Sequence, residues 1–95
     1  MAELNWTAEA EISLREIYDH IAQNRPATAQ RTIESILNRV ESLREAPTLG
    51  QPYPHRQRQV RRLTYGQFQI AYLLEDGGSV VILGVFHGLI FLPLS

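Results

Sequence analysis

The sequence contains no cysteine and no lysine. The absence of cysteine excludes disulfides and any metal site built on thiolates, and it is typical of a reducing compartment, so we expect a cytoplasmic protein. All nine basic residues are arginine, whose planar guanidinium group suits contacts with phosphates, carboxylates and base edges. The codon bias of a GC-rich genome explains the missing lysines equally well.

Long apolar runs are also missing. The longest uncharged apolar run, residues 80–92, includes Gly84, His87 and Gly88 and falls short of the roughly 20 residues that span a bilayer. The N-terminus has acidic residues where a secretory signal needs a basic start and an apolar stretch. We expect neither a membrane span nor export.

Familiar catalytic and cofactor signatures are absent as well. The chain has no glycine-rich phosphate loop, no nucleophile elbow and no Ser-His-Asp pattern. Glu16 and His20 stand one helical turn apart, but two ligands do not make a metal site, and an ordinary surface pair explains them. We expect no cofactor and no metal.

What the chain does have is enough apolar material for one small domain. Its 95 residues are 44% apolar, which indicates a folded globule and leaves no length for a second core. A domain of this size buries only about two-thirds of the surface that its unfolded chain exposes, so help from a partner would be no surprise. We treat residues 1–95 as one domain with an apolar tail at residues 89–95.

The charges are unevenly distributed. The net charge is -1, but residues 1–55 hold five arginines against eight acidic residues, whereas residues 56–95 hold four arginines against two. Those four arginines fall within seven positions: Arg56, Arg58, Arg61 and Arg62. On a strand, three of them share one face, and Arg61 lies on the other. The cluster indicates contact with an anionic partner; the alternative is a solvated sheet edge protected against aggregation.

The first third of the chain predicts a strand followed by a helix. Apolar and polar residues alternate over residues 4–6, as in a short strand. Thr7 is placed to cap a helix, and apolar residues then recur at helical spacing until about Gln23. The spacing is carried by Leu14, Ile17, Tyr18 and Ile21.

A second helix is predicted to begin near Pro26, with Asn24 as its cap, because proline is tolerated only in the first turn. Its apolar stripe continues until Pro47 and Gly50 end it. Two amphipathic helices joined by so short a link are expected to pack as an antiparallel hairpin.

After Gly50 the apolar period changes from 3.6 to 2, which indicates strands. We predict strands over residues 59–65, 67–74 and 79–86, with "EDGG" as a hairpin turn between the last two. Apolar residues occupy both parities of the last strand, so both of its faces should be covered. The predicted fold is α+β with the order β-αα-βββ, an N-terminal strand and a helical hairpin packed on an antiparallel sheet.

Several side chains are candidates for a chemical role. His87, at the end of the last predicted strand, is a candidate general base, although a structural histidine is the simpler interpretation. His20 and His55 are weaker candidates. Tyr65 and Tyr72 could stack on nucleic-acid bases, but Tyr72 shares the parity of the apolar strand face and fits the core better.

With this order of elements, the sequence resembles the RelE/ParE superfamily of type II toxin–antitoxin toxins, and is most similar to its ParE, or plasmid-stabilisation, branch. Three stretches in order carry the resemblance, from Leu4 to Gly88: "NWTAEAEISLREIYDHIA", "RPATAQRTIESILNRVESLREAPTLGQP" and "VRRLTYGQFQIAYLLEDGGSVVILGVFHG".

The resemblance implies the β-αα-βββ fold and a partner. Members of the superfamily are held inactive by a cognate antitoxin, ParD-like or of another DNA-binding class, whose C-terminal segment wraps the toxin. Operator DNA is bound only through the antitoxin. ParE-like members poison DNA gyrase, and RelE-like members cleave mRNA on the ribosome. The resemblance therefore implies gyrase as the target here and ribonuclease activity as the alternative.

The nuclease motif can be compared residue by residue. Where it has an arginine after the aromatic residue of the middle strand, this chain has Gln69, and where it has a second arginine just past the last strand, this chain has Leu89. The tyrosine beyond has no counterpart. Arg62 does match a basic position of the nuclease, so Arg62 and His87 are the residues to test for catalysis. So few cationic groups favour inhibition by binding.

The chain also differs from ParE-like sequences. Relatives continue their "HG" with arginines, whereas here Leu89 and Phe91 belong to an apolar tail. The third hypothesis is therefore a degenerate, non-toxic member that still binds an antitoxin. An apolar end needs cover, which an intramolecular dock, a partner chain or a homodimer seam would supply. We count Leu89 and Phe91 among the candidate partner-binding residues.

The resemblance also offers an explanation for the arginine cluster. Arg56, Arg58, Arg61 and Arg62 are predicted to face an acidic segment of the antitoxin, because arginine forks pair well with carboxylates. Gyrase, or DNA bound to gyrase, is the competing partner for the same surface.

Overall fold

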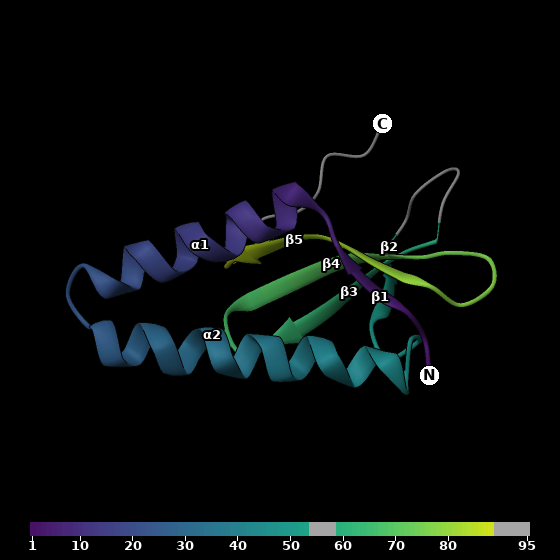
Figure 1. The fold of residues 1–95 in the computed structure, drawn as a ribbon, viewed down its shortest axis with the longest axis horizontal. Coiled ribbons are helices and arrows are strands. Elements are labelled where there is room, and N and C mark those ends of the chain that lie inside the picture. Colours follow the sequence, from purple (N-terminus) through teal and green to yellow (C-terminus); the bar gives the residue numbers. More distant parts are fainter. Residues whose placement is uncertain (54–58, 89–95) are drawn as a thin grey trace.

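The fold is a helical hairpin packed on one face of a sheet (Figure 1). The structure, a computed structural model, describes residues 1–53 and 59–88. In chain order the elements are β1 (Leu4–Trp6), α1 (Ala8–Ala22), α2 (Pro26–Glu41), the 3-10 turn η1 (Ser42–Arg44), β2 (Gln51–Tyr53), β3 (Val60–Tyr65), β4 (Phe68–Leu74) and β5 (Val80–His87). The predicted α+β fold and the order of its helices and main strands are confirmed.

The sheet has five strands in the order β1-β5-β4-β3-β2. β1 pairs with β5 in parallel, and the other three pairs are antiparallel, so the sheet is mixed rather than wholly antiparallel as predicted. The strand β2 was not predicted, because it has only three residues and contains Pro52. The direction of β1 depends on the path of the chain through both helices, which no local pattern reveals.

Thr7 caps α1 as predicted. Its hydroxyl oxygen accepts a hydrogen bond from the Ala10 N–H at 3.1 Å, and the same hydroxyl donates to the Ile82 carbonyl of β5 at 2.8 Å. The cap therefore also joins the start of the helix to the sheet. α1 ends at Ala22, one residue before the predicted Gln23.

The second helix begins at Pro26 as predicted, but the predicted cap at Asn24 is wrong. Arg25 occupies the capping position and makes no side-chain capping bond. Proline at the first helical position has no N–H, so one fewer N–H at the helix start lacks a partner.

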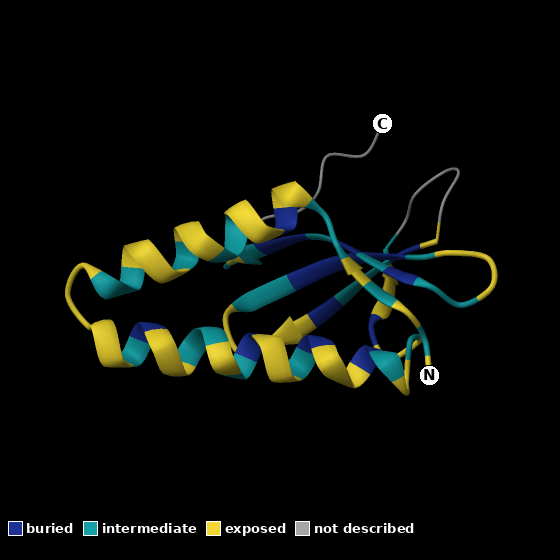
Figure 2. Cartoon of the chain, viewed as in Figure 1, coloured by how far each residue is buried: buried dark blue, intermediate teal, exposed yellow. Residues whose placement is uncertain are grey.

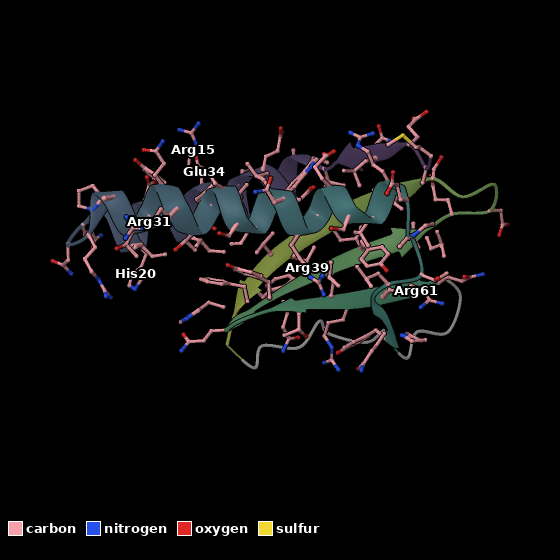
Figure 3. The ribbon with its side chains drawn as sticks, turned by 90° about the horizontal axis from the view of Figure 1, so that it is seen from below. Arg15, His20, Arg31, Glu34, Arg39 and Arg61 are labelled. Carbon is pink, nitrogen blue, oxygen red and sulfur yellow. The ribbon has the colours of Figure 1, made fainter. Side chains whose placement is uncertain are left out.

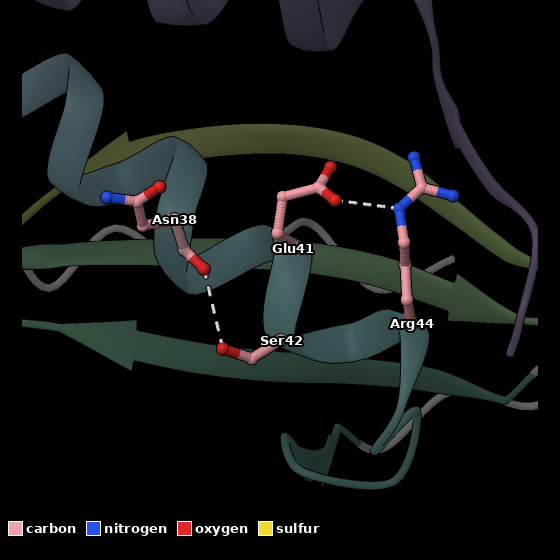
Figure 4. Close-up of polar contacts among 4 residues, drawn as sticks. All are labelled: Asn38, Glu41, Ser42 and Arg44. Carbon is pink, nitrogen blue, oxygen red and sulfur yellow. Dashed lines mark hydrogen bonds and ion pairs between the residues drawn. The ribbon is translucent and has the colours of Figure 1, made fainter.

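The second helix ends earlier than predicted. The α-helix stops at Glu41, and the chain tightens into the 3-10 turn η1 before Pro47. Figure 4 shows the contacts there: the Ser42 hydroxyl donates to the Asn38 carbonyl at 3.4 Å, and Arg44 Nε pairs with Glu41 Oε1 at 2.7 Å. The first bond occupies one of the carbonyls that the ending helix leaves without a partner, and the second joins two side chains across the turn.

The turn between β4 and β5 is the predicted "EDGG" hairpin. Gly77 and Gly78 have φ angles of 92° and 97°, a conformation open to glycine but strained for other residues. The Glu75 N–H donates to the Ser79 carbonyl at 2.8 Å and closes the turn. Further along the pair, a register shift beside Tyr72 places an extra residue of β5 opposite β4.

The strand register divides the sheet into two faces. We call the side covered by α1 and α2 the helix face and the other side the opposite face. On β3, β4 and β5, the helix face carries Arg61, Leu63, Ile70, Tyr72, Val80, Ile82 and Val85, and the opposite face carries Val60, Arg62, Ala71, Leu73, Val81, Gly84 and Phe86. In Figure 3, turned from the first view, the helices lie on one side of the sheet.

The main core lies between the hairpin and the helix face (Figure 2). It joins Ala10, Ile36, Val40 and Leu43 to Leu63, Ile70, Tyr72, Val80, Ile82 and Val85. The Ser13 hydroxyl of α1 also accepts a hydrogen bond from the Val85 N–H at 3.0 Å, which fastens α1 to the irregular part of β5. In the part of the chain that the structure describes, neither helix combines the length and apolarity needed to cross a bilayer.

Candidate functional site

The described arginines of the cluster separate onto the two sides of the sheet. Arg61 lies opposite Tyr72 on the helix face, and Arg62 lies opposite Ala71 on the other face. This is the division that the strand parity predicts. Arg56 and Arg58 lie outside the described residues, so their place on the opposite face remains a prediction.

Arg61 fastens the loop that leads from η1 to β2. Its guanidinium donates to the Gly50 carbonyl at 2.6 Å and to the Thr48 carbonyl at 3.2 Å. Charged donors make the stronger kind of hydrogen bond to carbonyls. In the isolated chain Arg61 therefore has an architectural role, and its predicted contact with a partner would have to be made beside these bonds. Figure 3 shows Arg61 near the C-terminal end of α2.

Tyr72 fastens the same loop from the core. Its hydroxyl donates to the Pro47 carbonyl at 2.7 Å and accepts from the Gly50 N–H at 2.9 Å. A Cβ at Gly50 would stand 2.8 Å from the tyrosine ring and 2.9 Å from the Arg62 carbonyl, so only glycine allows this approach. The side chain has no exposed surface, and the prediction that Tyr72 belongs to the core is confirmed.

The pKa of Tyr72 is raised above its ordinary value of 10.0. Burial of the ring is the main cause, and the Gly50 N–H and the charge of Arg61 oppose it. The hydroxyl therefore stays protonated at neutral pH and remains a hydrogen-bond donor. It holds the loop in place and is poorly suited to exchange protons with a substrate.

Arg62 lies on the opposite face beside β2. Its guanidinium carbon is 5.6 Å from the centre of the Tyr53 ring, a cation–π distance, and its strand partner in β2 is Gln51. The aromatic ring holds the cation near the sheet edge, at the start of residues 54–58, which carry the rest of the predicted basic cluster.

His87 ends β5 as predicted and is exposed. Its Nε2 atom is 3.0 Å from Gln67 Oε1, and its ring centre is 5.1 Å from that of Phe68. The imidazole therefore packs against the turn between β3 and β4. Among the described residues, the side chain that hydrogen-bonds the ring is Gln67, and no carboxylate bonds it to make it a stronger base.

The two candidate catalytic residues are far apart. Arg62 faces the side without helices, whereas His87 has the register of the helix face. Arg62 is on β3 and His87 is on β5, so they are separated by about 10 Å across the sheet. Along the strand direction they are offset by three residues, which adds a separation of about 10 Å. A phosphate held by Arg62 would thus lie beyond the hydrogen-bond reach of His87. Leu89, Phe91 and His55 lie outside the described residues.

A feature that the sequence did not predict is an apolar groove on the helical hairpin. It has a volume of about 520 Å³ and is lined by Trp6, Leu14, Tyr18, Ile33 and Leu37, with Glu11, Arg15 and Asp19 at its rim. Tyr18 and Leu37 remain 39% and 38% exposed. The helical spacing did single out these residues, but the gap between α1 and α2 depends on how the helices diverge.

Across residues 1–53 and 59–88, no three His, Asp or Glu residues lie close enough together to hold an ion. The pair Glu16 and His20 on α1 is not part of any larger ligand group within those ranges.

One family model matches most of the chain. The sequence model of the ParE toxin of the type II toxin–antitoxin system parDE matches residues 4–89. No sequence among the curated proteins matches the chain.

Two solved structures are similar. One comes from the chromosomal ParDE toxin–antitoxin system of P. aeruginosa, with 27% identity, a TM-score of 0.78, and coverage of 93% of this chain and 97% of that one. The other comes from the RelBE2 toxin–antitoxin complex of Mycobacterium tuberculosis, with 20% identity, a TM-score of 0.70, and coverage of 90% and 96%. The second likeness concerns the fold alone.

Proposed function

Because the chain belongs to the ParE toxin family of type II toxin–antitoxin systems, we propose that it is a toxin that inhibits DNA gyrase by binding and is neutralised by a cognate antitoxin. One observation carries the choice of binding over catalysis: Arg62 and His87 lie on different faces of the sheet, about 10 Å apart in each of two directions.

Ribonuclease action without a metal requires cations and proton-transferring groups around one phosphate. The described residues do not converge in this way, since Arg61 holds a loop, Gln69 is uncharged and His87 faces Gln67. Inhibition by binding has no such requirement. It needs only a surface that fits the target, and Arg62 supplies a cation on such a surface.

The target can be tested directly with purified protein. We expect the chain to inhibit ATP-dependent supercoiling by gyrase and to leave ribosome-bound mRNA intact. The variant His87→Gln should keep its gyrase inhibition within about twofold, whereas a general base in a nuclease would lose a hundredfold or more. Ribosome-dependent mRNA cleavage with unaffected gyrase would overturn the proposal. Unperturbed gyrase, mRNA and growth would instead identify a degenerate member.

The antitoxin is proposed to contact the arginine cluster. The variant Arg56→Ala/Arg58→Ala/Arg62→Ala should bind it more weakly and with less dependence on salt, because fewer ion pairs form. The antitoxin would be the product of the neighbouring gene. The control Arg25→Ala/Arg31→Ala/Arg39→Ala removes the same charge at three arginines that do not line the groove of the hairpin, and it should change the affinity little. Equal losses in both variants would remove this role.

The groove of the hairpin is proposed as the second antitoxin contact. Its apolar walls and its rim of both charge signs suit an amphipathic segment. Leu37→Glu should weaken antitoxin binding by at least about tenfold, because a carboxylate would then face the apolar side of that segment. Ile12→Glu is the matched control, since Ile12 is 58% exposed on α1 and does not line the groove.

A further inference from the structure

One flank of α2 carries arginine and hydroxyl side chains and no acidic one. Arg31, Ser35 and Arg39 recur at every fourth residue, so each lies about 6 Å further along the helix than the one before. Thr32 lies beside them on the same flank. Figure 3 shows Arg39 on the side of α2 that faces the strands, whereas Glu34 points away from them. The flank therefore presents positive charge and hydrogen-bond donors beside the sheet.

The two arginines of this flank are not paired with carboxylates. Within the described residues, neither Arg31 nor Arg39 makes an ion pair. Arg31 donates instead to the Thr28 hydroxyl at 3.3 Å. Glu41, at the end of α2, pairs with Arg44 at 2.7 Å, as Figure 4 shows. Both guanidinium groups of the flank can therefore bind an external anion.

The sheet beside this flank adds no negative charge. Residues 59–74, which include β3, β4 and the turn between them, contain no Asp and no Glu. Arg61 lies on the helix face near the C-terminal end of α2, and its bonds to two carbonyls leave its charge in place. Positive charge at three points along α2 gives this side of an acidic chain an attraction for anions.

Ring side chains of three strands form one row at the end of the helix face. Tyr65 lies opposite Phe68, and Phe68 lies opposite His87. Phe68 is partly buried against the core and lies against His87, which in turn contacts Gln67. Tyr65 is 36% exposed, and its hydroxyl has no hydrogen-bond partner among the described residues. The Tyr65 ring can therefore stack on a planar group from solvent.

The exposed ring and the arginines lie on the same side of the molecule. In Figure 1, α2 runs along the β3 side of the sheet, whereas α1 packs on β5. Tyr65, on β3, is thus the ring of the row nearest to α2. Its neighbour Phe68 packs against the core that Ile36 joins, and Ser35 directly precedes Ile36 in the helix. The ring therefore lies level with the middle of the arginine flank.

We propose that this surface, formed by Arg31, Ser35, Arg39 and Tyr65, binds single-stranded nucleic acid. Guanidinium forks and hydroxyl groups suit phosphate oxygens, and an exposed aromatic ring stacks on any base that is not already stacked in a duplex. An acidic protein segment would pair with the arginines but would leave the ring without a role. The operator DNA assigned to an antitoxin is a duplex, so this contact is a different one and goes beyond the proposed function.

Fluorescence anisotropy with a labelled strand of about 12 thymidines would test the contact to phosphates. The full chain without antitoxin should bind with a Kd of about 1–100 µM at about 150 mM salt, the range for contacts made mainly to phosphates. Arg31→Ala and Arg39→Ala should each reduce the slope of log K against log salt by about 0.7, the value for one phosphate contact of a single strand. Arg44→Ala is the matched control for Arg39→Ala, since Arg44 is also half-buried but pairs with Glu41, and it should leave the slope unchanged.

The contact to bases is tested separately at Tyr65. Tyr65→Ala should weaken binding about 5- to 150-fold, whereas Tyr65→Phe keeps the ring and should stay within about twofold. A duplex of the same length should compete at least about fivefold less well than the single strand, because its bases are already stacked. Circular dichroism would verify the fold of each variant, and the arginine variants test the same surface if Tyr65→Ala does not fold.

Three results would overturn the proposal. The first is no change in anisotropy up to about 100 µM protein. The second is the same salt slope for Arg39→Ala and Arg44→Ala. The third is equal binding by Tyr65→Ala and Tyr65→Phe together with full competition by polyglutamate, which would identify an acidic protein segment as the occupant. Neither gyrase nor the antitoxin takes part in the test, so its failure would leave the proposed function standing.

Discussion

The helix face and the opposite face of the sheet both carry buried apolar residues, but only the helix face belongs to the core that includes the two helices. The helix face packs against two helices that sequence patterns predict, and its contacts form one continuous core. The opposite face carries buried residues outside that core and ends in a basic edge at Arg62. The comparison teaches that a strong helical period identifies the layer that covers one face of the sheet and says nothing about the other face.

The neighbours Arg61 and Arg62 show the same division at the level of single side chains. One residue apart in β3, they point to different faces. Arg61 binds backbone carbonyls of the protein itself, and Arg62 lies against Tyr53 at the edge that we assign to partners. A cluster of like residues in the sequence is thus not one functional unit.

The largest loss of stability is expected from a substitution on the side of the core that faces the helices. Ile36→Ala removes a side chain with no exposed surface and should cost about 2–5 kcal/mol of unfolding free energy. Leu73→Ala on the opposite face should cost about 2 kcal/mol, at the lower end of that range, because Leu73 lies outside the core cluster that joins the helices to the sheet. Urea unfolding would measure both. A cost near zero for Leu73→Ala would mean that the opposite face is not packed.

The next largest loss of stability is expected when the hydrogen bonds between Tyr72 and the loop before β2 are removed. Tyr72→Phe removes the hydroxyl that bonds Pro47 and Gly50 and should cost about 1–3 kcal/mol, because two buried backbone groups lose their partner. Tyr65→Phe, at a half-exposed ring, is the matched control and should stay within about 0.5 kcal/mol. Thermal unfolding of both variants checks this, and equal shifts would contradict it.

Substitution of Arg61 should mainly lower the stability of the protein, whereas substitution of Arg62 should mainly weaken antitoxin binding. Arg61→Ala is expected to lower stability by about 1–2 kcal/mol, since two carbonyls lose a charged donor that is partly exposed. Arg62→Ala loses at least its cation–π contact with Tyr53, worth about 0.5–1 kcal/mol, and should weaken antitoxin binding more than Arg61→Ala does. Calorimetry of both variants, alone and with antitoxin, would test the division. The reverse order of effects would break it.

The smallest expected effect is a change in how the melting temperature depends on pH. The pKa of Tyr72 is raised in the folded protein. Its contribution to the free energy of unfolding is therefore fully present below 10.0, the pKa in the unfolded chain, and is lost as the pH rises through the folded pKa. The melting temperature should therefore fall more steeply above about pH 10 in the wild type than in Tyr72→Phe. Parallel curves for the two proteins would show that the hydroxyl does not titrate with unfolding.

Much of the fold could be predicted because it rests on local patterns. The cap at Thr7, the start of α2 at Pro26, the glycine turn and the strand parities all depend on residues close together in the chain. The core place of Tyr72 and the division of Arg61 from Arg62 follow from parity as well. The wrong cap at Asn24 and the early end of α2 are errors at helix ends, where several local solutions have similar energies.

By itself, the sequence determined the order of the main elements, the core position of Tyr72 and the faces on which Arg61 and Arg62 lie, because periodicity acts within a few residues. Only the tertiary structure decided the parallel pairing of β1 with β5, the strand β2, the groove of the hairpin and the separation of Arg62 from His87. These depend on how distant segments pack, and the free energy of that packing is shared among residues that no local window contains together.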